Sequence, residues 1–130
     1  MTFEQLDFLY TPSADVAADA RFHVDVLGGR LVFAIEDGGT RVAMVELTTG
    51  PPRIVLTDHL EGERPILVYR VANLVTARAE LAAHGLKPER LLEIPQGPLS
   101  SYVAPGGERF ALYEETRSGV LSHFDARRDF

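Results

Sequence analysis

The sequence predicts an α+β fold of two tandem β-α-β-β-β modules, whose curved mixed sheets surround a cleft and carry the helices on their convex side. One observation behind this prediction is a repeat about 58 residues apart, in which residues 7–11 and 67–71 resemble strands and each precede a helix-like stretch that ends in glycine. The other is that each copy continues with three short apolar runs separated by Gly or Pro turns. Because such modules bury their shared faces only against each other, the functional surface is expected between the copies.

The first module is expected over about residues 3–59. Alternating apolar residues predict a strand over residues 3–11, and Pro12 ends it. Asp15 is a suitable helix N-cap, because its carboxylate can accept from the free amides of the first turn. Gly28 ends the helix. The buried face of this helix is expected to consist of Val16, Ala20, Val24 and Leu27.

Three strands complete the first module. Residues 31–36 and 41–47 are expected to form a hairpin, because Asp37-Gly38 between them is a strong turn signal. A further strand is expected over residues 53–58, after a turn containing two prolines. The polar residues 60–65 then form the linker between the copies.

The second module is expected over about residues 66–115, with Asn73 at the cap position that Asp15 holds in the first. The buried stripe of its helix is predicted to be Leu74, Ala77, Leu81 and Ala82, with Gly85 as the stop. Its last three strands are expected over residues 91–94, 100–104 and 109–114. Residues 1–130 are thus interpreted as a single domain of two modules and a tail, residues 116–130. In the tail, a short helix is predicted from the spacing of Val120, Leu121 and Phe124 behind Ser118, a candidate cap.

Composition limits the possible functions. An apolar fraction of 45% in 130 residues suits a folded domain, and no stretch approaches the roughly 20 apolar residues of a membrane span. The absence of cysteine excludes disulfides, thiolate metal sites and cysteine nucleophiles. A net charge of −6 argues against nucleic acid as a partner. These features are typical of a cytoplasmic protein that contacts neither membrane nor nucleic acid.

Three motifs give the chain a family resemblance. Residues 11–16 (TPSADV) precede the first helix, residues 22–28 (FHVDVLG) end it, and residues 105–110 (PGGERF) precede the last strand. In these segments the chain resembles the vicinal oxygen chelate superfamily, which includes glyoxalase I, bleomycin-resistance proteins and extradiol dioxygenases. The resemblance covers about residues 5–115 and implies the two-module fold. It implies no single activity, because the superfamily contains several chemistries as well as binding proteins.

The resemblance also implies where a metal would be held, and the residues there do not suit one. The family's ligands are commonly a His on the first strand of each module and a Glu on the last strand of the second, with an extra acid in glyoxalase I. The matching positions in this chain are Phe8, Ile66, Ala111 and, for the extra acid, Val55. None of these side chains can coordinate a cation. We therefore expect no metal and no cofactor.

Side-chain alternation along strands indicates what surrounds the cleft instead. If the family's ligand positions face inward, the cleft has an apolar base with aromatic and arginine groups around it, which is typical of a small-molecule pocket. The candidate ligand-binding residues are Phe8, Tyr10, His59, Arg70, Arg109 and Tyr113. Each also has a structural interpretation: an arginine at a strand end can extend to solvent, and a tyrosine can simply pack in the core.

Two functions from different classes follow. The first is a metal-free small-molecule-binding protein of the bleomycin-resistance type, whose ligand is partly aromatic, with an anionic group as an open option. The alternative is an enzyme of the same superfamily, a lyase, isomerase or dioxygenase with an atypical or metal-free active site that uses Tyr, His59 or Arg groups. No carboxylate pair or nucleophile–base couple identifies a catalytic residue. Family members usually pair, so a homodimer is expected, with exchanged modules or joined sheet edges as the two options.

Overall fold

The structure is a computed structural model that describes residues 3–130; residues 1 and 2 of the expected domain lie outside it. The first module consists of β1 (Gln5–Pro12), α1 (Val16–Arg21), the π-helix η1 (Phe22–Val26), β2 (Arg30–Asp37), β3 (Thr40–Glu46) and β4 (Arg53–Thr57). The second consists of β5 (Ile66–Arg70), α2 (Leu74–Ala83), β6 (Arg90–Ile94), β7 (Gly97–Val103) and β8 (Arg109–Tyr113). A short 3-10 helix, η2 (Val120–Phe124), follows in the tail. The predicted order of elements is confirmed.

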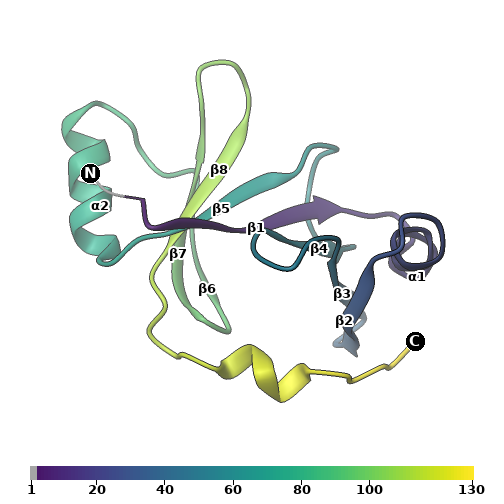
Figure 1. The fold of residues 1–130 in the computed structure, drawn as a ribbon. Coiled ribbons are helices and arrows are strands. Elements are labelled where there is room, and N and C mark those ends of the chain that lie inside the picture. Colours follow the sequence, from purple (N-terminus) through teal and green to yellow (C-terminus); the bar gives the residue numbers. More distant parts are fainter. Residues whose placement is uncertain (1–2) are drawn as a thin grey trace.

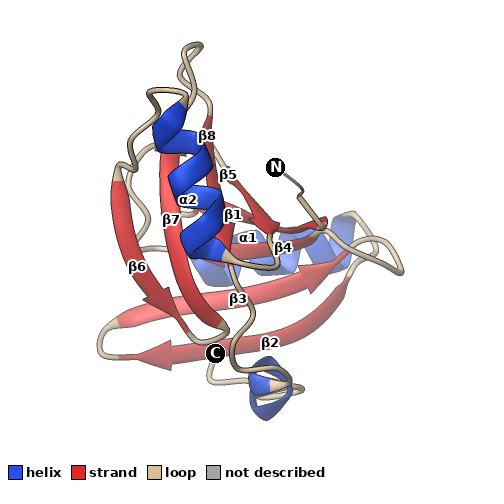
Figure 2. Ribbon diagram, turned by 90° about the vertical axis from the view of Figure 1, so that its left-hand side faces the viewer, coloured by secondary structure: helices blue, strands red, loops and turns tan. Residues whose placement is uncertain are grey.

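All eight strands form one curled sheet in the order β2-β3-β4-β1-β5-β8-β7-β6. Each module repeats the same pairing, because β1 lies parallel to β4 as β5 lies parallel to β8, and the other neighbours are antiparallel. The antiparallel pair β1 and β5 joins the two modules within one chain. The chain thus builds its own concave face from both copies, as Figures 1 and 2 show.

The helices cover the convex side of the sheet, as expected. On the first module, Val16 and Ala20 of α1 pack against Ala34, Ala43 and Leu56. On the second, Leu74 and Ala77 of α2 pack against Tyr102 and Leu112. Both predicted caps are present, since Asp15 Oδ1 accepts from the Ala18 amide at 3.0 Å and Asn73 Oδ1 from the Thr76 amide at 2.9 Å. Each short helix is therefore fixed by one apolar stripe and one cap.

Four local expectations are corrected. The first helix changes to a π-helical turn at Phe22, which rotates the following residues, so Leu27 is half exposed instead of buried. Ala82 of α2 is exposed, so the buried stripe ends at the partly buried Leu81. Strand β7 begins at Gly97, three residues before the predicted start, because Gly97 and Pro98 pair with β6. In the tail, Gly119 precedes η2 in a left-handed conformation and no side chain caps that turn, so Ser118 is not the cap.

The C-terminal tail crosses to the first module. Beyond η2, the Ala126 amide donates to the Val32 carbonyl, and the backbone of residues 127–129 pairs with Ala34 on the outer edge of β2. The Asp129 carboxylate accepts from the Glu36 amide, and the Arg41 guanidinium lies 4.6 Å from the ring centre of Phe130. Figure 1 shows the tail, in yellow, running below the sheet from the second module to β2. The tail therefore covers one of the two sheet edges.

Candidate functional site

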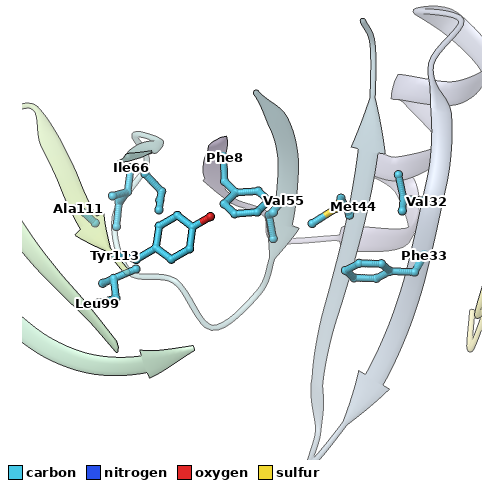
Figure 3. Close-up of a cluster of buried hydrophobic side chains, with 10 residues drawn as sticks. Phe8, Val32, Phe33, Met44, Val55, Ile66, Leu99, Ala111 and Tyr113 are labelled. Carbon is cyan, nitrogen blue, oxygen red and sulfur yellow. The ribbon is translucent and has the colours of Figure 1, made fainter. Parts of the chain in front are cut away.

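The concave face carries apolar side chains from both modules. Phe8 of β1 and Val55 of β4 meet Met44 and Phe33 of the first module and Ile66 and Tyr113 of the second in one buried cluster, which Figure 3 shows. Residues that alternate with them, such as Leu56 and Leu112, lie in the clusters beneath the helices. Strand alternation therefore assigns these side chains to the correct faces.

The metal positions implied by the family resemblance lie inside this cluster. Phe8, Val55, Ile66 and Ala111 are each at most 8% exposed, and they contact other apolar groups. These four residues offer only hydrocarbon side chains at the positions where imidazole or carboxylate donors would be needed. Within residues 3–130, no three His, Asp or Glu side chains lie close enough together to hold a metal ion. The residues present do not fit the family's metal.

One cavity, here called the chamber, has a volume of about 360 Å³ and lies between the concave face of the first module and the tail. Its apolar wall consists of Phe33, Ile35, Val42, Met44, Val55, Leu60, Ile94, Pro95, Leu121 and Phe124. Leu121 and Phe124 of η2 pack on the concave cluster, and the Phe124 ring centre lies 5.7 Å from that of Phe33. The tail thus forms one wall of the chamber, which suits a small, largely apolar molecule.

A few polar groups face the chamber. Its lining includes Tyr10, Thr57, His59 and Gln96, and also the charged residues Asp37, Glu93 and Arg127. Burial raises the pKa of Tyr10 to about 12, although a hydrogen bond from the Gln96 side chain partly opposes this effect. Tyr10 is therefore a neutral hydroxyl at physiological pH. The His59 ring nitrogen Nδ1 lies 2.6 Å from Thr57 Oγ1, which fixes the orientation of the imidazole.

A second hollow of about 270 Å³, here called the Asp7 hollow, adjoins the chamber at Gln96 and Leu121, which contribute to both. It contains the buried carboxylate of Asp7, which accepts from the Tyr113 hydroxyl and from the Gln5 side-chain amide, each at 2.5 Å. Burial and the neighbouring Asp7 raise the pKa of Tyr113, so this hydroxyl keeps its proton and remains a donor. The lining of this hollow has a larger polar share than that of the chamber.

The six predicted site residues lie around three adjoining hollows instead of one cavity. Tyr10 and His59 face the chamber and also a third hollow of about 250 Å³, which Arg109 lines. Phe8 and Tyr113 line the Asp7 hollow, with ring centres 6.0 Å apart. The remaining residue, Arg70, lies beside the Asp7 hollow, because its guanidinium is 3.7 Å from Asp7. Their role in ligand binding stays a prediction.

Both candidate arginines already have partners within the chain. Arg70 is ion-paired with Glu4 at 3.4 Å and with Glu115 at 3.8 Å, besides Asp7. Arg109 donates from Nη2 to the backbone carbonyl of Arg64 at 2.5 Å. A guanidinium that is engaged in this way has fewer donors left for an anionic ligand.

Asp7 and Gln96 are two residues of the site that sequence reasoning did not select. Between Leu6, paired with Tyr69, and Phe8, paired with Val68, the register of β1 against β5 shifts by one residue. Asp7 is the extra residue of this bulge, so strict alternation gives the wrong face for it. The signal that could have drawn attention to Asp7 is the charge itself, because Asp is rare inside a strand. Gln96 lies in a turn whose Pro and Gly residues indicate only a loop.

Comparisons with known proteins support the fold. No protein-family model and no curated protein matches the sequence. Among solved structures, methylmalonyl-CoA epimerase from Mycobacterium tuberculosis has a TM-score of 0.68 at 20% identity, with 90% of this chain and 94% of that chain covered. Hypothetical protein BH1468 from Bacillus halodurans C-125 has a TM-score of 0.74 at 16% identity, with 88% and 96% covered. A Streptomyces coelicolor methylmalonyl-CoA epimerase variant in complex with 2-nitronate-propionyl-CoA has a TM-score of 0.71 at 15% identity, again with 88% and 96% covered.

The comparisons confirm the expected fold, which is that of the vicinal oxygen chelate superfamily, to which methylmalonyl-CoA epimerase belongs. Several of these solved structures are methylmalonyl-CoA epimerases. At 13–20% sequence identity, the similarity to these structures shows the fold of this chain but not its substrate. Within residues 3–130, no helix has the length and apolar character needed to cross a membrane.

Proposed function

We propose that the protein binds a small, partly aromatic and largely apolar molecule in the chamber, without a metal. The observation that carries this proposal is the chamber itself, which combines an apolar wall with the polar groups of Tyr10, Thr57, His59 and Gln96. Three charged residues, Asp37, Glu93 and Arg127, also belong to its lining. Bulk apolar contact with a few orienting polar groups is the usual composition of a ligand site. The apolar side chains at the family's metal positions support a mode of action that needs no cation.

Catalysis on the bound molecule is the second candidate, and it is supported by the likeness of the fold to several methylmalonyl-CoA epimerases. Epimerisation requires removal and return of a proton, and the chamber offers Tyr10 as a neutral acid and His59 as an imidazole. The Thr57 hydroxyl, 2.6 Å from His59 Nδ1, orients the ring so that the other nitrogen is free for proton transfer. In this version Tyr10 and His59 take the roles that metal-bound groups would otherwise fill.

The binding test uses a variant that fills the chamber. Ile35 is a partly buried residue of the chamber wall, so Ile35→Trp places an indole in the cavity. Val103→Trp is the matched control, because Val103 is 40% exposed on β7 and belongs to none of the three hollows. A calorimetric screen of neutral bicyclic aromatic compounds should give ligands that bind the unmodified protein and Val103→Trp equally. Binding of the same compounds to Ile35→Trp would contradict the chamber as the site.

The enzymatic candidate is tested with the compounds that bind. Incubation in D2O followed by mass spectrometry detects deuterium gained at a carbon atom, which reports proton exchange even when substrate and product have the same mass. Tyr10→Phe and His59→Gln should each abolish exchange while binding is preserved within a few-fold. Exchange that is unchanged in both variants would assign the chemistry to other residues. Binding without exchange in the unmodified protein would leave the protein as a binder.

A further inference from the structure

Among the described residues, Gln96 is the polar side chain that lines both the chamber and the Asp7 hollow. Its side chain belongs to both linings together with Leu121, and the residue is 5% exposed. Its carbonyl oxygen Oε1 is buried and has no hydrogen-bond partner among the described residues. Buried acceptors are nearly always satisfied, and one that is not costs free energy. An unpaired acceptor beside a cavity indicates that a molecule bound in the cavity donates the missing hydrogen bond.

The backbone around Gln96 is held in place beside the two hollows. The Gln96 carbonyl accepts from the amides of Thr116 and Arg117, both at 3.0 Å. The Arg117 guanidinium donates to the carbonyls of Pro95 and Ile94, both at 2.8 Å, and is 2.7 Å from the Glu93 carboxylate. The turn between β6 and β7 is thereby tied to the start of the tail. The backbone that carries the Gln96 side chain is therefore preorganised beside the two hollows.

Tyr10 supplies the second half of the arrangement. Tyr10 and Gln96 both line the chamber, and the Tyr10 hydroxyl stays protonated at physiological pH because burial raises its pKa. As a protonated hydroxyl, Tyr10 can donate to an acceptor on a bound molecule. The chamber therefore presents one donor, from Tyr10, close to one acceptor, Gln96 Oε1.

We propose that Gln96 determines ligand specificity: its Oε1 accepts a hydrogen bond from an N–H or O–H of the ligand, while the Tyr10 hydroxyl donates to an adjacent acceptor. This inference rests on the proposed binding function. The chemistry that fits is a neutral amide-like edge, such as that of a lactam, on an apolar aromatic body. A carboxylate is disfavoured at this position, because it would place negative charge against the carbonyl oxygen of Gln96 in a cavity whose lining already contains Asp37 and Glu93.

The experiment is a cycle of two proteins and two probes. The probes are quinolin-2(1H)-one, a bicyclic lactam, and its N-methyl derivative, which keeps the carbonyl acceptor and lacks the N–H donor. The proteins are the unmodified chain and Gln96→Met, which has a similar side-chain length and no amide. Gln5→Met is the matched control, because Gln5 also lines the Asp7 hollow but its amide donates to Asp7. Calorimetry gives the dissociation constant for each combination.

We expect the unmodified protein and Gln5→Met to bind the lactam at least about fivefold more tightly than its N-methyl derivative, the size expected for one neutral hydrogen bond. In Gln96→Met this preference should disappear, and Gln96→Leu provides a second variant if Gln96→Met does not fold. Equal binding of the two probes by the unmodified protein, or a preference that persists in the Gln96 variants, would overturn this inference and leave the chamber as a binding site. If neither probe binds any of the folded proteins, the inference and the proposed chamber function both fall.

Discussion

The ring of Phe124 on η2 lies against the ring of Phe33 on β2, with centroids 5.7 Å apart and planes tilted by 53°. These residues are far apart in the sequence, and their contact joins the C-terminal tail to the first module. Both rings also line the chamber. The same contact therefore stabilises the attachment of the tail and closes the cavity, so its removal is expected to change both properties.

The first prediction concerns Phe124→Ala. Since the ring is partly buried, its loss should lower the free energy of unfolding by about 1.5–2.5 kcal/mol, below the 3–5 kcal/mol typical of a fully buried Phe. Chemical denaturation measures this change. Phe22→Ala is the control, because the Phe22 ring is 45% exposed on η1, and it should change the free energy of unfolding by less than about 1 kcal/mol. Equal effects of the two substitutions would mean that η2 is not packed on the sheet.

The second prediction concerns the buried pair of Asp7 and Tyr113. Tyr113→Phe removes the hydroxyl that donates to the Asp7 carboxylate at 2.5 Å, and should lower the free energy of unfolding by about 1–3 kcal/mol because a buried acceptor loses a donor. Asp7→Asn weakens the same bond from the other side. The double variant should therefore be less destabilised than the sum of the two single variants. Strict additivity would show that the two groups do not interact.

The third prediction concerns stability at high pH. The pKa of Tyr10 is raised to about 12, and that of Tyr113 is raised as well, whereas both should titrate near 10 in the unfolded chain. The folded state therefore holds these protons more tightly, so the stabilisation is complete below pH 10 and is lost as the pH rises from 10 through 12. Denaturation at a series of pH values should show this decline. Tyr10→Phe should reduce its slope, and an unchanged slope would mean that Tyr10 titrates normally.

Much of the fold could be predicted from the sequence, because the fold depends on local signals that agree with each other. Alternation placed Phe8 and Val55 on the concave face and Leu112 beneath a helix, because successive side chains of a regular strand always point to opposite faces. The caps Asp15 and Asn73 were predictable for the same reason, because a cap is set by its own turn.

The site could be predicted only in part, because it depends on irregularities that leave no pattern. The bulge at Asp7 reverses the face of one carboxylate, and the π-helical turn at Phe22 moves Leu27 into solvent. Gln96 became important only because the tail and the β6–β7 turn meet there. Arg70 and Arg109 were candidate ligand contacts, and their partners Asp7 and Arg64 come from segments whose arrangement the sequence does not show.

The fourth prediction concerns metal content. Phe8, Ile66 and Ala111 fill the family's ligand positions with hydrocarbon, so the protein purified without chelators should contain no stoichiometric Zn, Ni, Mn or Fe. Elemental analysis measures this directly. The same reasoning predicts that methylglyoxal–glutathione isomerisation and catechol ring cleavage are absent. About one metal ion per chain would contradict the prediction and would require ligands from outside this concave cluster.

The last prediction concerns the sheet edges and the expected homodimer. The two outer strands differ, because the tail pairs with β2 at Ala34, whereas β6 at the other end carries Leu91 and Leu92, which are 56% and 47% exposed. If the chain pairs through an edge, we expect it to use β6, since β2 is already covered.

Light scattering at micromolar concentration should therefore give twice the 14.3 kDa chain mass for the full-length protein, and for the variant Leu91→Lys with Leu92→Lys it should give the monomer mass. Removal of residues 118–130 should leave the β6 contact intact, open the chamber and expose β2, so species larger than a dimer should appear. A full-length protein of monomer mass would reject the dimer. A dimer that survives both lysine substitutions would place the contact on another surface.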